Sequence, residues 1–136
     1  QFISSPTPFN TLLWRIVGIN GDQYFESYFS LFDGTSPLSI RYYPRNLALA
    51  AEIKEHPPVL KLEHFTRGYF AYSNEGNYVA MTDLRMGAEP DYVFKFKVAE
   101  LNETHPTPIE DKRIKVSMNL RSLFSIWNRI WNPDST

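Results

Sequence analysis

The chain contains no cysteine and only 3 histidines. The missing cysteines exclude disulfides, thiolate-bound zinc and a cysteine nucleophile within these residues. The histidines, His56, His64 and His105, lie far apart, and prolines follow two of them directly. A metal site needs several ligands that converge, often with a pair at short spacing. We therefore expect no metal site within this chain, and capping or surface roles for the histidines.

The chain also has no excess charge of one sign and no long apolar run. Its 14 Lys and Arg residues nearly balance 15 Asp and Glu residues, which leaves a formal net charge of −1. A nucleic-acid-binding protein carries a strongly basic surface, so that class is not expected. No apolar run approaches the ~20 residues that cross a bilayer, and no signal-peptide pattern is present. We expect a soluble unit and, because the chain begins at Gln1 and not at Met, part of a longer protein.

Catalytic motifs are absent as well. The sequence has no phosphate-binding loop, no dinucleotide-binding fingerprint and no Gly-x-Ser-x-Gly motif. Its carboxylates are scattered over predicted helices and loops, so they indicate no acid–base pair. The sequence therefore predicts no catalytic residue and no cofactor in this chain.

Aromatic residues, by contrast, are abundant at 15% of a chain that is 43% hydrophobic and 21% charged. This balance is typical of an ordered globular protein, and 136 residues predict a single domain over 1–136. Aromatic side chains pack well on a pleated surface, which favours β-structure.

Alternating bulky and polar residues predict about six strands. Their ranges are 11–19, 23–32, 37–43, 67–73, 78–85 and 92–98, after an extended lead-in arm over 1–10. The pair Asn20-Gly21 is a strong signal for a hairpin turn between the first two. On 23–32, the more apolar set is predicted to face inward: Phe25, Ser27, Phe29 and Leu31.

Helices are predicted in two places. Asn46 could cap a helix over 47–56, which Pro57 and Pro58 would end, and 59–65 is either a short helix or a strand.

Residues 102–112 are predicted as a loop, before a brief strand at 113–117. A closing helix over 119–131 has one apolar stripe, formed by Leu120, Leu123, Phe124, Trp127 and Trp131. Short turns between consecutive strands favour an antiparallel sheet, so the predicted class is α+β, mainly antiparallel β, with a middle helical segment and a C-terminal amphipathic helix.

Asp83 and Arg85 are the first candidate functional residues. They stand two apart near a predicted strand end, so their side chains should share a face. One interpretation is structural: a cross-strand ion pair, or hydrogen bonds that close the strand end. The other is that they border a pocket together with Arg67 or Arg15.

A second candidate cluster combines Trp14 and Arg15 with the segment 41–45, which holds two further arginines among aromatic residues. Arginines in such company could hold a carboxylate or a phosphate. They could equally be solvated charges whose apolar stems pack on the sheet.

Three stretches together resemble a known family. They are residues 5–15 (SPTPFNTLLWR), 65–70 (FTRGYF), and 82–87 (TDLRMG) with 92–96 (YVFKF). They are similar to the soluble C-terminal domain of bacterial membrane-bound hydrolases for which metal dependence has been inferred, long catalogued as a domain of unknown function. The resemblance covers roughly residues 5–98. The histidine and acidic motifs of that family belong to its N-terminal membrane helices and have no counterpart here.

The resemblance implies an accessory domain attached to an inner-membrane protein, with its own N-terminal membrane domain as partner. A divalent metal would then belong to the parent protein and not to this chain. The domain would position substrate, with Asp83 orienting an arginine and the arginines receiving an anionic group. The residues proposed to bind this ligand are Trp14, Arg15, Arg67, Asp83 and Arg85.

Two other functions remain open. The chain could be a non-catalytic binding module for a small anionic ligand or a protein partner, which would dock on an exposed edge strand at 38–43. It could also be a self-contained enzyme, which is the least favoured. Membrane helices with clustered histidines upstream would favour the accessory domain, and a plain signal sequence would favour the binding module.

Overall fold

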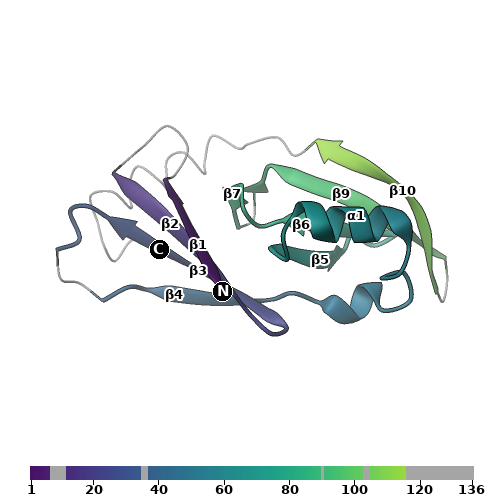
Figure 1. The fold of residues 1–136 in the computed structure, drawn as a ribbon, viewed down its shortest axis with the longest axis horizontal. Helices are drawn as coiled ribbons and strands as arrows, with labels where there is room; N and C mark the ends of the chain where they lie inside the picture. The colour runs from purple at the N-terminus through teal and green to yellow at the C-terminus, as the bar shows by residue number, and fades with distance from the viewer. Residues whose placement is uncertain (7–11, 35–36, 90, 103–104, 116–136) are drawn as a thin grey trace. The chain divides into compact units, whose positions relative to one another are not determined.

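A computed structural model describes residues 1–6, 12–34, 37–89, 91–102 and 105–115 (Figure 1). The chain divides into two compact units. Unit 1 comprises residues 1–43 together with 117–136, and unit 2 comprises residues 44–116. Each unit has its own antiparallel sheet, and the sequence-based expectation of one domain stays a prediction.

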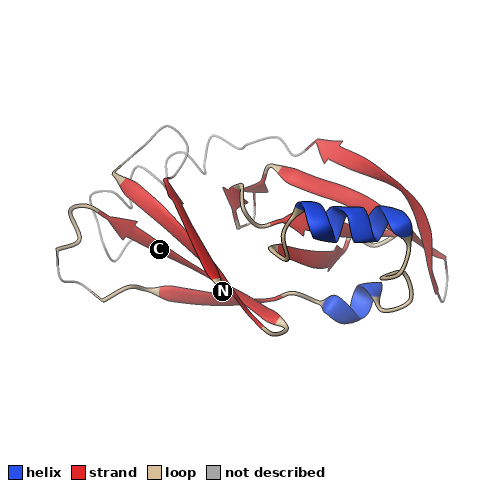
Figure 2. Cartoon of the chain, viewed as in Figure 1, coloured by secondary structure: helices blue, strands red, loops and turns tan. Residues whose placement is uncertain are grey.

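The sheet of unit 1 has four strands in the order β1-β2-β3-β4 (Figure 2). They are β1 (Phe2–Pro6), β2 (Leu13–Asn20), β3 (Gln23–Ser30) and β4 (Ile40–Pro44). The predicted hairpin between β2 and β3 is confirmed, with Asn20 opposite Gln23 and Gly21 at φ 56°. Glycine suits this turn because it adopts positive φ without steric cost. The predicted lead-in arm is partly strand, since β1 pairs with β2 along its whole length.

The predicted inward face of β3 is wrong. The side chains of Tyr24, Glu26 and Ser30 are buried. Of the predicted set, Ser27 is buried, but Phe25 and Phe29 are half-buried and Leu31 is 56% exposed. Glu26 faces inward because it forms an ion pair with Arg15 on β2, and both residues are at least 96% buried. The pairing neutralises two charges that could not otherwise be buried. Counting apolar residues alone therefore selected the wrong face.

The sheet of unit 2 also has four strands, in the order β10-β9-β6-β5. They are β5 (Phe70–Asn74), β6 (Tyr78–Asp83), β9 (Phe94–Asn102) and β10 (His105–Lys115). A short two-stranded ladder, β7 (Gly87–Ala88) with β8 (Asp91–Tyr92), lies between β6 and β9 in sequence. Gly87 has φ 109°, and a Cβ there would lie 2.7 Å from the Cα of Tyr92, so this position needs glycine.

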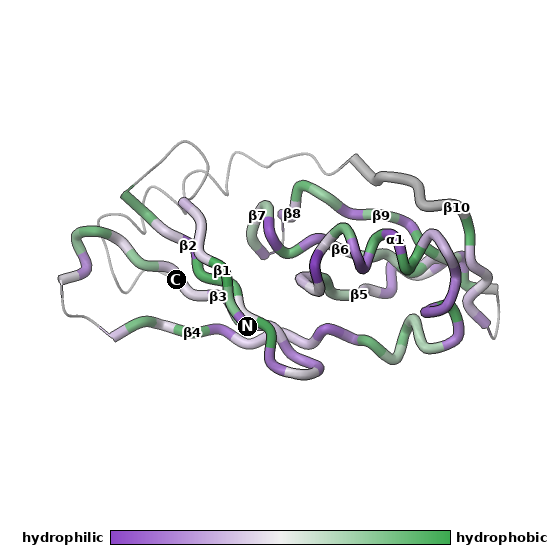
Figure 3. Tube along the Cα trace, in the orientation of Figure 1, coloured by the Kyte–Doolittle hydropathy of each residue, from purple (hydrophilic) through white to green (hydrophobic). Residues whose placement is uncertain are grey.

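The core of unit 2 lies between its sheet and its helical segment. The helical segment consists of the 3-10 helix η1 (Leu47–Ala50) and the helix α1 (Pro57–Phe65). Figure 3 shows hydrophobic and hydrophilic residues alternating along α1 and β9. The buried cluster is Ala50, Ile53, Val59, Leu62, Phe70, Tyr72, Val79, Met81, Val98 and Ala99. Apolar burial of this kind is the dominant favourable contribution to folding.

The helical prediction is confirmed in part. Residues 47–56 form η1 and turns instead of one helix, whereas 59–65 belong to α1, whose first turn contains Pro57 and Pro58. Asn46 does not cap η1 with its side chain; its Nδ2 donates to the Tyr72 carbonyl at 3.0 Å. Proline fits a helix start because the first backbone N–H groups have no partner inside the helix.

The predicted loop at 102–112 is wrong, because most of it belongs to β10. Pro106 and Pro108 signalled a loop, but β10 is the edge strand of its sheet, where a missing backbone donor is tolerated. The pairing of β10 with β9 shifts register between Pro108 and Lys112. The two prolines therefore led to the prediction of a loop where the structure has an irregular edge strand.

The predicted class is confirmed: the fold is mainly antiparallel β with one short helix. The described residues form ten strands, not about six, because β1, β7, β8 and β10 carry no clear alternation. The predicted helix at 119–131 lies outside the described residues. Among the residues that are described, no helix is both long and apolar enough to span a bilayer.

Candidate anion-binding site

The end of α1 lies beside the end of β6 in unit 2. The first residue of β5, Phe70, is opposite the last residue of β6, Asp83. The turn over 66–69 connects α1 to β5, and the Leu84 N–H donates to the Tyr69 carbonyl at 2.9 Å. These contacts bring the turn and the segment that follows β6 together.

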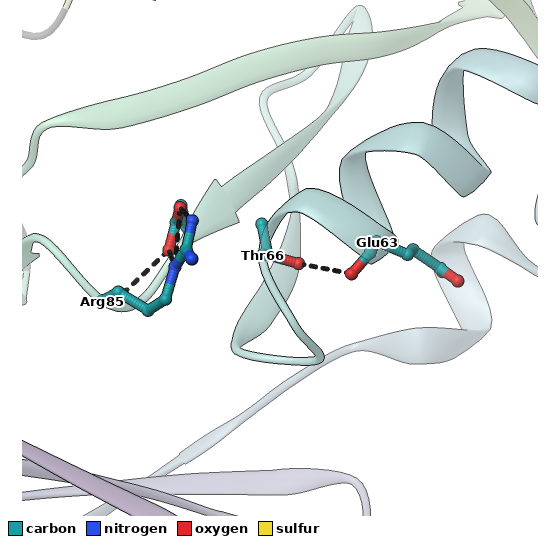
Figure 4. A network of polar contacts seen from close by, with 4 residues as sticks. Glu63, Thr66 and Arg85 are labelled. Atoms are coloured by element: carbon teal, nitrogen blue, oxygen red, sulfur yellow. Dashed lines mark hydrogen bonds and ion pairs between the residues drawn. The ribbon is translucent and has the colours of Figure 1, made fainter.

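The turn after α1 has an unusual backbone. Arg67 and Gly68 both adopt left-handed conformations, at φ 54° and 83°. Thr66 anchors the turn, since its buried hydroxyl donates to the Glu63 carbonyl at 3.0 Å (Figure 4). Glycine is the usual residue where a helix ends in a left-handed conformation, so an arginine at Arg67 is strained.

Asp83 holds Arg85 in a fixed orientation. One carboxylate oxygen, Oδ1, accepts from the backbone N–H and from Nε of Arg85 at 3.0 and 2.9 Å. The other, Oδ2, accepts from Nη2 at 2.6 Å (Figure 4). Arg85 lies just beyond the last residue of β6, so these bonds close the strand end, as the structural interpretation predicts.

The Arg85 guanidinium is also stacked on an aromatic ring. It lies 4.9 Å from the ring centroid of Phe65, the last residue of α1. The hydrogen bonds to Asp83 raise the pKa of Arg85 above its ordinary value, so the group stays cationic. Asp83 is 1% exposed, whereas Arg85 is 26% exposed. The carboxylate therefore belongs to the interior and the guanidinium reaches solvent.

One nitrogen of Arg85 is left for a ligand. Nε and Nη2 bond to Asp83, and Nη1 makes no hydrogen bond within the described part of the chain. The surrounding surface is partly apolar, since Phe65 and Met86 are 54% and 53% exposed. Arg67 is exposed on the adjacent turn. The arrangement offers the oriented N–H groups of Nη1 beside an apolar surface, which suits an oxygen of a carboxylate or phosphate.

Arg15 and Trp14 belong to unit 1 and are placed differently. Arg15 is paired with Glu26, while Trp14 is half-buried on the opposite face of β2. Tyr28 lies opposite Arg15 on β3, and its pKa is raised by burial and by the negative charge of Glu26. Arg15 therefore contributes to the interior of unit 1.

Arg45, from the predicted cluster at 41–45, binds two backbone carbonyls of unit 2. Its Nε donates to the Phe70 carbonyl at 2.9 Å and its Nη2 to the Gly68 carbonyl at 3.1 Å. The guanidinium also stacks on the Phe70 ring at 4.7 Å. Arg45 thus stabilises the start of β5 and the strained turn before it. Arg41, by contrast, is exposed.

Sequence reasoning identified Asp83 and Arg85 but missed Phe65 as their neighbour. No pattern in the sequence pairs Phe65 with Arg85, because their contact depends on where α1 ends relative to β6. The role of Arg45 was also missed, although its aromatic neighbours drew attention to it.

The histidines occupy separate places. His56 precedes α1 in the capping position, and His105 contacts Glu52 at 3.2 Å. Within the described ranges, no three His, Asp or Glu side chains gather into a group that could hold a metal ion.

Comparisons with protein-family models, with curated proteins and with solved structures found no significant match.

Proposed function

We propose that the chain is a substrate-positioning accessory domain that holds an anionic group at Arg85. In this proposal its partner is the N-terminal membrane domain of a bacterial membrane-bound hydrolase, as the sequence resemblance implies, and any divalent metal belongs to that membrane domain. The single observation that supports it is the Asp83–Arg85 pair, in which a buried carboxylate orients a partly exposed guanidinium.

The physical basis is preorganisation. An arginine side chain free in solvent must lose rotamer freedom when it binds a ligand. Here the Asp83 carboxylate and the Phe65 ring already fix the Arg85 side chain, so less freedom is lost on binding. Asp83 balances the charge of Arg85, and the exposed Arg67 on the next turn adds the positive charge that an anion needs.

The direct test replaces Arg85 by Ala and compares it with Arg41→Ala, which removes an exposed arginine of unit 1. Inorganic phosphate and acetate are titrated into each chain and followed by nuclear magnetic resonance. We expect saturable shifts around Arg85 in the wild type and in Arg41→Ala, and none in Arg85→Ala. Saturable shifts that survive Arg85→Ala in a folded chain would overturn the site.

A second test addresses the accessory role. The chain is studied together with its membrane domain, with hydrolysis of phosphate and carboxylate esters as the readout. A positioning role predicts that Arg85→Ala raises KM and leaves the metal content unchanged. If Arg85→Ala loses anion binding but leaves KM unchanged, the anion site exists but has no role in positioning the substrate of that enzyme.

The second candidate function is a binding module for a protein partner, and one observation favours it. β4 is an edge strand, and the side chains of Leu38, Ile40 and Tyr42 on and before it are 43%, 46% and 57% exposed. An exposed edge can accept a further strand from another protein. A partner captured through β4, in a chain with intact anion binding, would favour this function.

A further inference from the structure

The two faces of the unit 1 sheet differ in an unexpected way. One face contains the buried residues Leu13, Arg15 and Val17 of β2 and Tyr24 and Glu26 of β3. We call the opposite face the outer face. Residues directly opposite on paired strands share a face, so the register gives its members: Phe2, Ser4 and Pro6 on β1, Trp14, Ile16, Gly18 and Asn20 on β2, and Gln23, Phe25, Ser27 and Phe29 on β3.

β4 extends the outer face to the other edge of the sheet. The ring of Tyr42 lies 5.9 Å from the ring of Phe25, which places Tyr42 on the outer face. Side chains alternate along a strand, so Ile40 lies there too. Tyr43 has the opposite orientation, since it stacks on the buried Tyr24 at 5.2 Å.

Among the residues that the structure describes, the outer face carries no charged side chain. Its members are aromatic, aliphatic or small, apart from the serines and the uncharged amides Asn20 and Gln23 at the hairpin end. The Arg15–Glu26 pair is on the opposite side. Phe2, Ile40 and Tyr42 are 69%, 46% and 57% exposed. Gly18 makes the face flat, because the Phe25 ring lies over the position that a Cβ would occupy. A flat, uncharged, apolar sheet face is typical of an interface.

The size of the outer face fits a second sheet of the same kind. Phe2 and Tyr42 alone offer roughly 200–300 Å² per copy, since an aromatic side chain covers about 150–250 Å². The other members add less, because the aromatic and aliphatic ones on β2 and β3 are half-buried and Ser27 is 2% exposed, so the area stays below the ~800 Å² per partner of a standard interface. Two four-stranded sheets packed face to face, about 10 Å apart, also match the size of an ordinary β-sandwich core.

Charge and edges favour a second copy over a lipid surface. Two uncharged faces meet in a twofold dimer without repulsion between like charges. The described members of the outer face include no Lys or Arg to attract anionic headgroups, and Phe2 and Tyr42 lie on the two edge strands. Immersing those edges in hydrocarbon would leave backbone groups without partners.

We propose that the outer face of unit 1 is a dimer interface between two copies of this chain, packed sheet on sheet. The dimer is reversible, with a dissociation constant on the order of micromolar, because the area is near the lower bound for stable association. This inference does not depend on the anion site of unit 2.

The experiment measures the mass of the chain by analytical ultracentrifugation between about 1 µM and 1 mM, where a micromolar dimer must form. Ile40→Glu places a charge on the outer face. Leu60→Glu is the matched control, because Leu60 is 49% exposed on α1 of unit 2. We expect the wild type and Leu60→Glu to dimerise, and Ile40→Glu to dimerise at least about tenfold more weakly.

A second variant separates sheet-on-sheet packing from pairing between β4 edges. Ile16 is half-buried on the central strand β2, so Ile16→Lys charges the outer face and leaves β4 unchanged. Loss of the dimer in Ile16→Lys, with an unchanged circular dichroism spectrum, supports the proposal. A dimer that survives Ile16→Lys would overturn it in favour of edge pairing. A wild type that stays monomeric at 1 mM would overturn it as well, and a monomer that binds phosphatidylcholine vesicles would identify lipid as the occupant.

Discussion

The two units use similar sheets in opposite ways. Unit 2 buries a hydrophobic cluster that includes Val59 and Met81, and its Asp83–Arg85 pair lies at a strand end. Unit 1 buries the Arg15–Glu26 pair and leaves an uncharged aromatic face partly exposed. The difference teaches that an alternating strand predicts two faces but does not predict which one is buried. We therefore expect the largest losses of stability from a buried charged residue in unit 1 and from a buried apolar residue in unit 2.

Glu26→Gln should produce the largest loss of stability in unit 1. It removes the negative charge of Glu26 from a buried ion pair with Arg15, and breaking a buried pair costs about 3–5 kcal/mol. Urea unfolding followed by circular dichroism measures the change. Glu100→Gln is the control, because Glu100 pairs with Lys97 at the surface while 52% exposed. Equal stability of Glu26→Gln and Glu100→Gln would remove the contrast between the units.

Met81→Ala tests the apolar core of unit 2. Met81 is fully buried, and truncation of such a side chain removes its contacts and leaves a cavity, which costs about 2–5 kcal/mol. In unit 1, Ile40→Ala on the outer face should cost much less in the monomer, because Ile40 is 46% exposed. Thermal unfolding of both variants at low micromolar concentration makes the comparison. A larger loss from Ile40→Ala would show that the outer face is already covered within the chain.

High pH should destabilise both units through buried tyrosines. Burial, aided by the charge of Glu63, raises the pKa of Tyr72 in unit 2 above its ordinary 10.0. Burial and the charge of Glu26 do the same for Tyr28 in unit 1. The unfolded state then loses these protons first, so the stability is complete below pH 10 and falls as the pH rises above it.

Tyr72→Phe should therefore lose less stability than the wild type when the pH rises above 10. Near pH 7 it should cost about 1 kcal/mol, because the Tyr72 hydroxyl no longer donates to Glu63, at 3.0 Å in the wild type. Urea unfolding at pH 7 and pH 11 measures both effects. A pH dependence identical to that of the wild type would show that Tyr72 does not carry it.

The smallest stability effect should come from Arg67→Gly, and its sign is the informative part. Relief of the left-handed backbone at φ 54° should stabilise unit 2 by about 0.5–1 kcal/mol. The same change should weaken phosphate binding, because the positive charge on the turn is lost. Stabilisation with unchanged binding would show that Arg67 is not part of the site.

The sequence predicted what depends on local rules. The Asn20-Gly21 turn and the central hairpin of β5 and β6 follow from turn chemistry and periodicity. At 59–65 the sequence left a helix and a strand open, and the structure has the helix. The Asp83–Arg85 contact was also within reach, because it joins residues two positions apart.

What the sequence did not predict depends on contacts between distant residues. The inward face of β3 was set by Glu26 pairing with Arg15, eleven residues away. The stacking of Arg85 on Phe65 requires α1 and β6 to end at the same place. Pro106 and Pro108 indicated a loop because their position at a sheet edge is invisible in the sequence.

The central claim is that Asp83 orients Arg85 to receive an anion. The most direct measurement follows the Nε–H resonance of Arg85 during titration with inorganic phosphate, in the wild type and in Asp83→Asn. In the wild type this resonance should be protected from exchange with solvent and should shift saturably with phosphate. In Asp83→Asn both the protection and the affinity should fall. If the Arg85 Nε–H is protected from exchange but its resonance does not shift with phosphate, the Asp83–Arg85 pair only closes the end of β6.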